Sequence, residues 1–204
     1  MEKFTTLTSV AAPMMQSNVD TDIIVPMDRM VTADRDAMHT FAFEPWRFLP
    51  DGSENPEFIL NQNTFRNAKI LLTGKNFGCG SSREGAVWSI AGLGIRCLIG
   101  TSFGNIFYNN CFQNGILPIK LPPEVIEAFT VLANSGGNAA VFEVDLENGL
   151  ITPSSGDPVT FDIEPNRRTQ LLEGLDDVGV TLKRQGEIES FRESDQNNRP
   201  WIYV

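Results

Sequence analysis

Between residues 68 and 133, short apolar runs alternate with segments of helical periodicity, and this alternation restricts the fold more than any other feature of the chain. The apolar runs have strand length, and apolar residues recur at helical spacing in the segments that follow them. The predicted strands are 68–73, 95–99 and 116–121, and the predicted helices are 82–93, 103–112 and 122–133. Strand–helix–strand units of this kind build a parallel sheet, so the chain is expected to be an α/β protein.

The flanking segments complete the predicted fold. One strand is expected at 4–10 and a long loop at 34–64, where three prolines and an Asp-Gly turn signal occur. After Gly137 the pattern changes to short apolar runs separated by turn residues, which predicts an antiparallel meander with strands at 140–146, 150–152 and 159–163. Closing helices are predicted at 167–175 and 177–188, before an irregular tail at 197–204. We therefore predict one domain over 1–204, with mixed sheets in a core of about 1–165 and a C-terminal helical segment and tail at 166–204.

The composition indicates a globular chain with an acidic surface. Of the 204 residues 41% are apolar, and 26 acidic against 16 basic side chains give a net charge of −10. This excess opposes binding to nucleic acid or to an anionic membrane, which depends on clustered Lys and Arg. No apolar run approaches the roughly 18 residues of a membrane helix, and the first residues lack an apolar signal core. We expect a cytoplasmic protein whose partners include neither nucleic acid nor membrane.

The three cysteines and the single histidine do not have the spacing of a metal site. Cys79, Cys97 and Cys111 lie 18 and 14 residues apart, without the paired spacing typical of iron–sulfur or zinc ligands. An odd number of thiols in a chain of this length also opposes a disulfide framework. His39 stands beside a polar stretch and is expected to be a loop or surface residue. We predict that this chain holds no metal.

The densest chemical signal is the segment 74–84 (GKNFGCGSSRE), which leads from a predicted strand into a predicted helix. Its glycines permit tight turns that present backbone N–H groups. Ser81 is predicted to be the helix N-cap, with Glu84 completing a capping box. Neither a Walker loop nor the dinucleotide fingerprint matches, because Gly-Lys-Ser/Thr is absent and Arg83 stands in place of the third glycine. Two interpretations remain: a well-capped turn, or an anion site at the helix start, with Arg83 as a carboxylate-binding fork.

The distribution of charge favours the anion site. Between residues 66 and 120 the chain carries six basic side chains and one acidic side chain, Glu84. The remainder carries 10 basic and 25 acidic residues. A locally positive segment around a glycine-rich helix start, inside an acidic protein, suits a small anionic ligand.

Four ordered motifs carry a resemblance to a known family. They are 19–26 (VDTDIIVP), 76–84 (NFGCGSSRE), 102–107 (SFGNIF) and 110–119 (NCFQNGILPI). In order and spacing, over nearly the whole chain, they closely resemble the small subunits of 3-isopropylmalate dehydratase. The resemblance implies a three-layer β/β/α swivelling domain with mixed sheets, like the C-terminal domain of aconitase.

The resemblance also implies a function and a partner. It implies a heterodimer with a separate large subunit that carries a [4Fe–4S] cluster, while this chain binds no cofactor. The pair would isomerise the dicarboxylate 2-isopropylmalate to 3-isopropylmalate through 2-isopropylmaleate, in leucine biosynthesis. Such a hydro-lyase would be active only when both subunits are present.

Individual residues take roles from the same resemblance. Ser81 matches the serine that removes a proton next to a carboxylate, and Arg83 matches the arginine that binds a substrate carboxylate. Gly80 and Ser82 lie in the same shell of substrate contacts. Asp22 matches an acidic residue of the aconitase active site, and Asp20 lies beside it.

The chemistry is consistent with these residue types. Removing a proton next to a carboxylate builds enolate-like charge, which preorganised donors must offset. Serine is a poor base, so backbone N–H groups of residues 78–82 are expected to favour its alkoxide. Arg83 offers a planar, bidentate fork that a lysine would not reproduce.

Substrate choice is less determined than mechanism. Many relatives have histidine where this chain has Gly85, and the loop 26–35 supplies Met27, Met30 and Val31 either for an alkyl group or for ordinary packing. Two alternatives therefore stay open: the small subunit of a related dehydratase for methylmalate- or dimethylmalate-type acids, and a non-catalytic anion-binding regulatory module.

Overall fold

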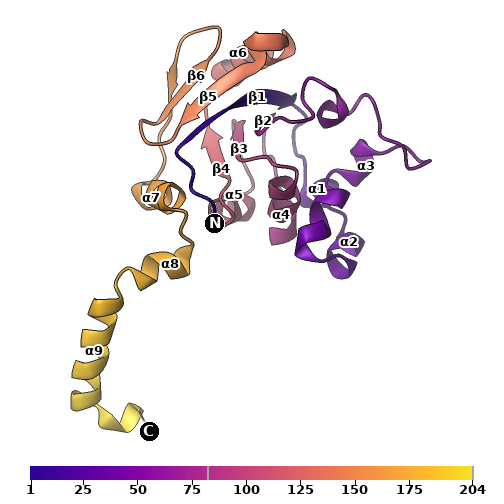
Figure 1. Ribbon diagram of the computed structural model, residues 1–204. Helices are drawn as coiled ribbons and strands as arrows, with labels where there is room; N and C mark the ends of the chain where they lie inside the picture. Colours follow the sequence, from indigo (N-terminus) through magenta and orange to yellow (C-terminus); the bar gives the residue numbers. More distant parts are fainter. Residues whose placement is uncertain (82, 204) are drawn as a thin grey trace.

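A mixed sheet forms the frame of the molecule (Figure 1). The computed structural model describes residues 1–81 and 83–203. Within them, seven strands follow the order β4-β3-β2-β1-β5-β6-β7. The strands are β1 (Thr6–Met14), β2 (Ile70–Thr73), β3 (Cys97–Gly100), β4 (Leu117–Lys120), β5 (Val141–Asp145), β6 (Leu150–Pro153) and β7 (Val159–Thr160). The predicted α/β class with a parallel and an antiparallel part is confirmed.

Strand β1 belongs to both halves of the sheet. Its first part, Thr6 to Val10, pairs antiparallel with β5, and its second part, Ala11 to Met14, pairs parallel with β2. β2, β3 and β4 continue the parallel half, and β5, β6 and β7 form the predicted meander. The predicted mixed sheets are thus one sheet, whose parallel and antiparallel halves are joined through β1, and that strand is nine residues long because it serves both.

Helices cover the two faces of the parallel half separately. Their bounds are α4 (Glu84–Gly92), α5 (Asn105–Gln113) and α6 (Pro123–Asn134). α4 and α5 bury their apolar stripes with Leu71 and Leu98 on one face. α6 packs with Ile70, Leu72 and Ile99 on the other, so the two helix groups lie on opposite sides of the sheet in Figure 1. Successive side chains of a strand point to opposite faces of the sheet, so Leu71 lies in one core and its neighbours Ile70 and Leu72 lie in the other.

The segment 34–64 is more ordered than the predicted loop. It contains η1 (Arg35–Phe41), α3 (Glu44–Arg47) and η2 (Ile59–Asn61), and it follows α1 (Thr21–Ile24) and α2 (Met27–Thr32). Met38, Phe43 and Phe58 from this segment are buried in the same core as α4. Its prolines and turns therefore separate short helices, and these helices cover one face of the sheet.

The C-terminal region begins on the body of the molecule and then leaves it. α7 (Pro165–Glu173) buries Leu171, whose carbonyl accepts a hydrogen bond from the N–H of Phe4 at 2.8 Å. α8 (Asp177–Leu182), α9 (Gln185–Asn198) and η4 (Pro200–Ile202) then project away (Figure 1). The single helix expected at 177–188 is therefore two, and α9 extends into the predicted irregular tail. One further short helix, η3 (Gly137–Ala140), precedes β5, and among the described helices none has the length and apolar character needed to cross a membrane.

Candidate functional site

Three chain segments meet where the parallel strands β1, β2 and β3 end. The N–H of Gly78 donates to the carbonyl of Val19 at 2.7 Å, and the N–H of Thr21 donates to the carbonyl of Cys79 at 3.0 Å. On the other side, the N–H of Gly104 donates to the carbonyl of Phe77 at 2.9 Å. The carboxyl ends of parallel strands share one edge of a sheet, which is where α/β proteins commonly bind ligands. This edge brings together three of the four motifs found in the sequence.

Two glycines make the close approach of these segments possible. Gly78 has φ +70°, and a Cβ atom there would lie 2.2 Å from the ring of Phe107. A Cβ atom on Gly104 would lie 2.3 Å from the carbonyl oxygen of Gly78. Real side chains do not tolerate such distances. The segment after β2 and the start of α5 can therefore approach this closely only because positions 78 and 104 are glycines.

The start of α4 differs from the predicted capping box. Arg83, with extended φ −127° and ψ 112°, occupies the N-cap position, and among the described residues no side chain caps the helix. Ser81 is exposed outside the helix, and its carbonyl accepts from the hydroxyl of Thr21 at 2.9 Å. The Glu84 carboxylate instead accepts from the side-chain amide of Asn114 at 3.0 Å. The capping prediction is wrong because Arg83, and not Ser81, occupies the N-cap position of α4.

Arg83 pairs with Asp22 across the site. The Arg83 side chain is only 10% exposed, whereas that of Asp22 is 57% exposed. The guanidinium Nη1 contacts Asp22, while its Nε is buried without a hydrogen-bond partner in the described part of the chain. A guanidinium presents planar, paired donors that suit a carboxylate, so the role of Arg83 as a carboxylate-binding residue stays a prediction.

Asp20 has a structural task beside this pair. Its carboxylate accepts from the N–H of Ile23 at 2.8 Å and thereby caps α1. The cap holds the turn that carries Asp22 toward Arg83. A contact between Asp20 and substrate stays a prediction.

A pocket of about 180 Å³ lies between the segments. It is lined by residues 78–81, Arg83, Thr21 and residues 104–107. The pocket thus brings together three predicted site residues, Gly80, Ser81 and Arg83. Asp22 does not line the pocket but contacts Arg83, which does. Ser82 falls outside the described residues.

The wall formed by residues 104–107 was missed by reasoning from sequence. The motif at 102–107 was identified, but it was given no chemical role. It follows β3 as residues 74–81 follow β2, and that parallel placement is the signal that could have found it. Residues 105–107 are the first turn of α5, whose N–H groups have no acceptor within the helix and favour a negative ligand.

The backbone does not supply one donor that was expected for Ser81. The N–H of Gly78 is used in the hydrogen bond to Val19, so it cannot stabilise a Ser81 alkoxide. That part of the predicted N–H cradle is wrong, because Gly78 belongs to the crossing that ties the β1 and β2 segments together.

The cysteines occupy separate environments. Cys79 is partly exposed and lines the pocket, whereas Cys97 and Cys111 are fully buried, in different apolar cores. Burial raises the pKa of both the Cys97 and the Cys111 thiols. Over the residues that the structure describes, no group of three His, Cys, Asp or Glu side chains is arranged to hold a metal ion. His39 lies in η1, with its Nδ1 2.8 Å from the carbonyl oxygen of Asp36.

The residues proposed for substrate choice lie on α2. Met27 and Val31 are exposed, while Met30 packs toward the core beside α4. A Cβ atom at Gly85 would lie 2.8 Å from the terminal methyl of Met30, so Met30 occupies the space above that glycine. Met27, Met30 and Val31 do not line the pocket as it stands, and their role in specificity stays a prediction.

Known proteins similar to this chain agree with the motifs. A family model, the aconitase C-terminal domain, matches residues 1–124. The 3-isopropylmalate dehydratase small subunit of Paracoccus denitrificans is 48% identical over 202 residues, covering 99% of this chain and 100% of that protein. The small subunit from Paramagnetospirillum magneticum is 50% identical with the same coverage. The crystal structure of a 3-isopropylmalate dehydratase from Methanocaldococcus jannaschii superimposes with a TM-score of 0.66, at 25% identity, over 92% of this chain and 99% of that one.

Proposed function

Since this chain belongs to the family of 3-isopropylmalate dehydratase small subunits, which are parts of a hydro-lyase, we propose that it supplies half of the active site. In this proposal the complete enzyme isomerises 2-isopropylmalate to 3-isopropylmalate through 2-isopropylmaleate, a step of leucine biosynthesis, in the cytoplasm. The other half comes from a large subunit in a heterodimer.

The observation that carries the proposal is the pairing of Ser81 and Arg83 in one small pocket. The pocket of about 180 Å³ suits a small dicarboxylate better than a nucleotide or a polymer. Ser81 is exposed at its rim, and Arg83 presents a mostly buried guanidinium beside it. A general base next to a carboxylate receptor is the minimum that proton removal next to a carboxylate requires.

We assign separate tasks to the residues of the pocket. Arg83 binds one substrate carboxylate through its planar fork, and Asp22 holds the guanidinium in place. Ser81 removes the proton from the neighbouring carbon, and the enolate-like charge forms near Arg83 and the first turn of α5. Gly80 leaves room for the substrate beside Ser81, and Ser82 contributes a further substrate contact.

The proposal assigns part of the activation of Ser81 to the large subunit. A free serine hydroxyl is a weak base, and the Gly78 N–H that could have favoured its alkoxide is already bonded. The proposal therefore expects the large subunit to close over the pocket and to change the surroundings of Ser81.

Over residues 1–81 and 83–203, no group of three His, Cys, Asp or Glu side chains is arranged to hold a metal ion. We assign the [4Fe–4S] cluster to the large subunit.

The test is reconstitution from separate subunits. The chain is purified alone and together with the large subunit from the same genome, and hydration is assayed across maleates bearing isopropyl, methyl and dimethyl substituents. We expect turnover only from the pair, with the isopropyl compound preferred. Preference for a methyl or dimethyl compound would assign the chain to a related dehydratase, and absence of turnover from an assembled pair would favour a regulatory module.

A further inference from the structure

The C-terminal arm, defined as residues 176–203, exposes an unusual share of the molecule's apolar surface. Its large apolar side chains that are more than half exposed are Val178, Leu182, Phe191, Trp201 and Ile202. Within the described part of the chain, neither α8 nor α9 buries any of its side chains. A helix that buries none of its side chains among the described residues and carries large exposed apolar groups indicates a contact with another molecule.

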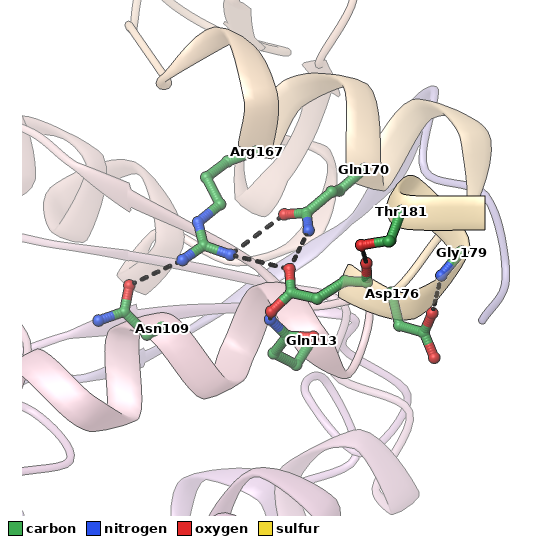
Figure 2. Close-up of polar contacts among 8 residues, drawn as sticks. Asn109, Gln113, Arg167, Gln170, Asp176, Gly179 and Thr181 are labelled. Atoms are coloured by element: carbon green, nitrogen blue, oxygen red, sulfur yellow. Dashed lines mark hydrogen bonds and ion pairs between the residues drawn. The ribbon is translucent and has the colours of Figure 1, made fainter. Parts of the chain in front are cut away.

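The arm has a defined root. Asp176 caps α8 by accepting from the N–H of Gly179 at 2.7 Å, and the carboxylate of Asp177 accepts from the side-chain amides of Gln113 and Gln170. Arg167 extends this network to Asn109, with 3.3 Å between Nη2 and Oδ1 (Figure 2). The network ties α8 to both α7 and α5, so the direction in which the arm leaves the body is set by side-chain contacts.

A groove opens at this root. It has a volume of about 780 Å³, and α7, α8 and the first half of α9 line it. Ile188 and Phe191, three residues apart and hence on one face of α9, contribute its apolar wall. A groove with an apolar wall and a polar rim suits an apolar side chain presented by a partner protein.

The comparisons indicate which partner this is. The aconitase C-terminal model stops at residue 124, before the meander of β5, β6 and β7 as well as before α7 and the arm, and by its name it describes the last domain of a longer chain. The separate small subunits match 99% of this chain, a share that includes nearly the whole arm. A domain within one chain is held to its neighbours by the peptide linkage, which gives a high effective concentration. A free-standing subunit has to replace that linkage with surface contacts.

Geometry allows the same partner to cover both the arm and the pocket. α5 is nine residues long, about 13 Å, with its first turn in the pocket and its last residue, Gln113, in the root network. α9 adds 14 residues, about 21 Å, beyond that root. A protein that closes over Ser81 and Arg83 is therefore within reach of the arm.

We propose that the C-terminal arm is the attachment site for the large subunit, with Ile188 and Phe191 on α9 as its main apolar contacts. This inference rests on the proposed function, because it takes the large subunit as the partner. A second copy of this chain is the competing occupant.

Binding measured without turnover tests the proposal. The full chain and its Ile188→Asp/Phe191→Asp variant are titrated with the large subunit, and the dissociation constant of the complex is determined. Val131→Asp serves as the matched control, because Val131 is 63% exposed on α6, far along the chain from the arm. We expect the arm variant to weaken the complex at least about thirtyfold, as loss of central interface residues does, and the control to change it less than about twofold. Circular dichroism and melting temperature should match wild type, since neither arm side chain is buried.

The outcomes are separable. An unchanged dissociation constant overturns the proposal, and so does an arm variant that alters only self-association in analytical ultracentrifugation, which would assign the arm to a second copy. A wild-type chain that does not bind the large subunit overturns it as well. Arm-dependent binding in a complex that does not turn over 2-isopropylmalate supports the arm but overturns the proposed function. If both hold, excess large subunit should restore the turnover of the arm variant.

Discussion

Replacing Arg83 with lysine separates substrate binding from structural ion pairing. Lysine keeps the positive charge but loses the planar fork. Arg83 uses Nη1 for Asp22, and among residues 1–81 and 83–203 its buried Nε has no hydrogen-bond partner. A single ammonium can serve Asp22 or a substrate carboxylate, but it cannot bind both with the same geometry.

The structure predicts effects of different size on stability and on activity. Asp22 is 57% exposed, so its pair with Arg83 contributes about 0–1 kcal/mol to the free energy of unfolding. If Arg83 binds substrate through contacts that strengthen in the transition state, kcat/KM should fall at least about a hundredfold, equivalent to about 2.7 kcal/mol. The melting temperature should change little.

The assay is hydration of 2-isopropylmaleate by the reconstituted pair, with complex formation measured in parallel. Arg66→Lys is the control, since Arg66 likewise pairs with a carboxylate, that of Glu54, but does so with two nitrogens and outside the pocket. Analogues with one carboxylate should lose less than dicarboxylates in the Arg83 variant. Unchanged kcat/KM in an assembled complex, or an equal loss in the Arg66 variant, would refute the substrate role.

Three further predictions follow from the site and its surroundings. Ser81→Ala should lower turnover at least about a thousandfold without changing the melting temperature, because Ser81 caps no helix; a loss of less than about tenfold, or 1.4 kcal/mol, would exclude it as the base. In the native chain an aromatic disulfide reagent should modify Cys79 alone, because burial raises the pKa of the other two thiols, and substrate should slow the reaction in the complex; more than one thiol titrated per folded chain would contradict this. Gly85→His should destabilise the chain by about 1–3 kcal/mol in urea unfolding through overpacking against Met30, and Met30→Ala should recover at least about 1 kcal/mol of that in a double-mutant cycle, whereas additive effects would show that the two positions do not interact.

Local signals located most elements and the main motif. Three short apolar runs, each followed by helical spacing, predicted β2, β3, β4 and the helices between them within a few residues. The glycine-rich segment was placed correctly between a strand and a helix. Errors arose where a local rule competed with packing. The spacing of Ser81 and Glu84 satisfies a capping box, yet Arg83 occupies the N-cap position, and Thr21 and Asn114 bind Ser81 and Glu84 from other elements.

The sequence by itself determined the α/β class, the net negative charge and the family, and it singled out Ser81 and Arg83 as the candidate chemical pair, because periodicity and motif spacing are properties of neighbouring residues. Tertiary structure alone decided which segments meet. The alignment of the strand ends brings Arg83 into contact with Asp22, 61 residues away, and makes the first turn of α5 a wall of the pocket. What the core leaves uncovered decides that the arm leaves the body after α7. These contacts join residues that are far apart in the sequence and result from burial, so a local sequence pattern does not predict them.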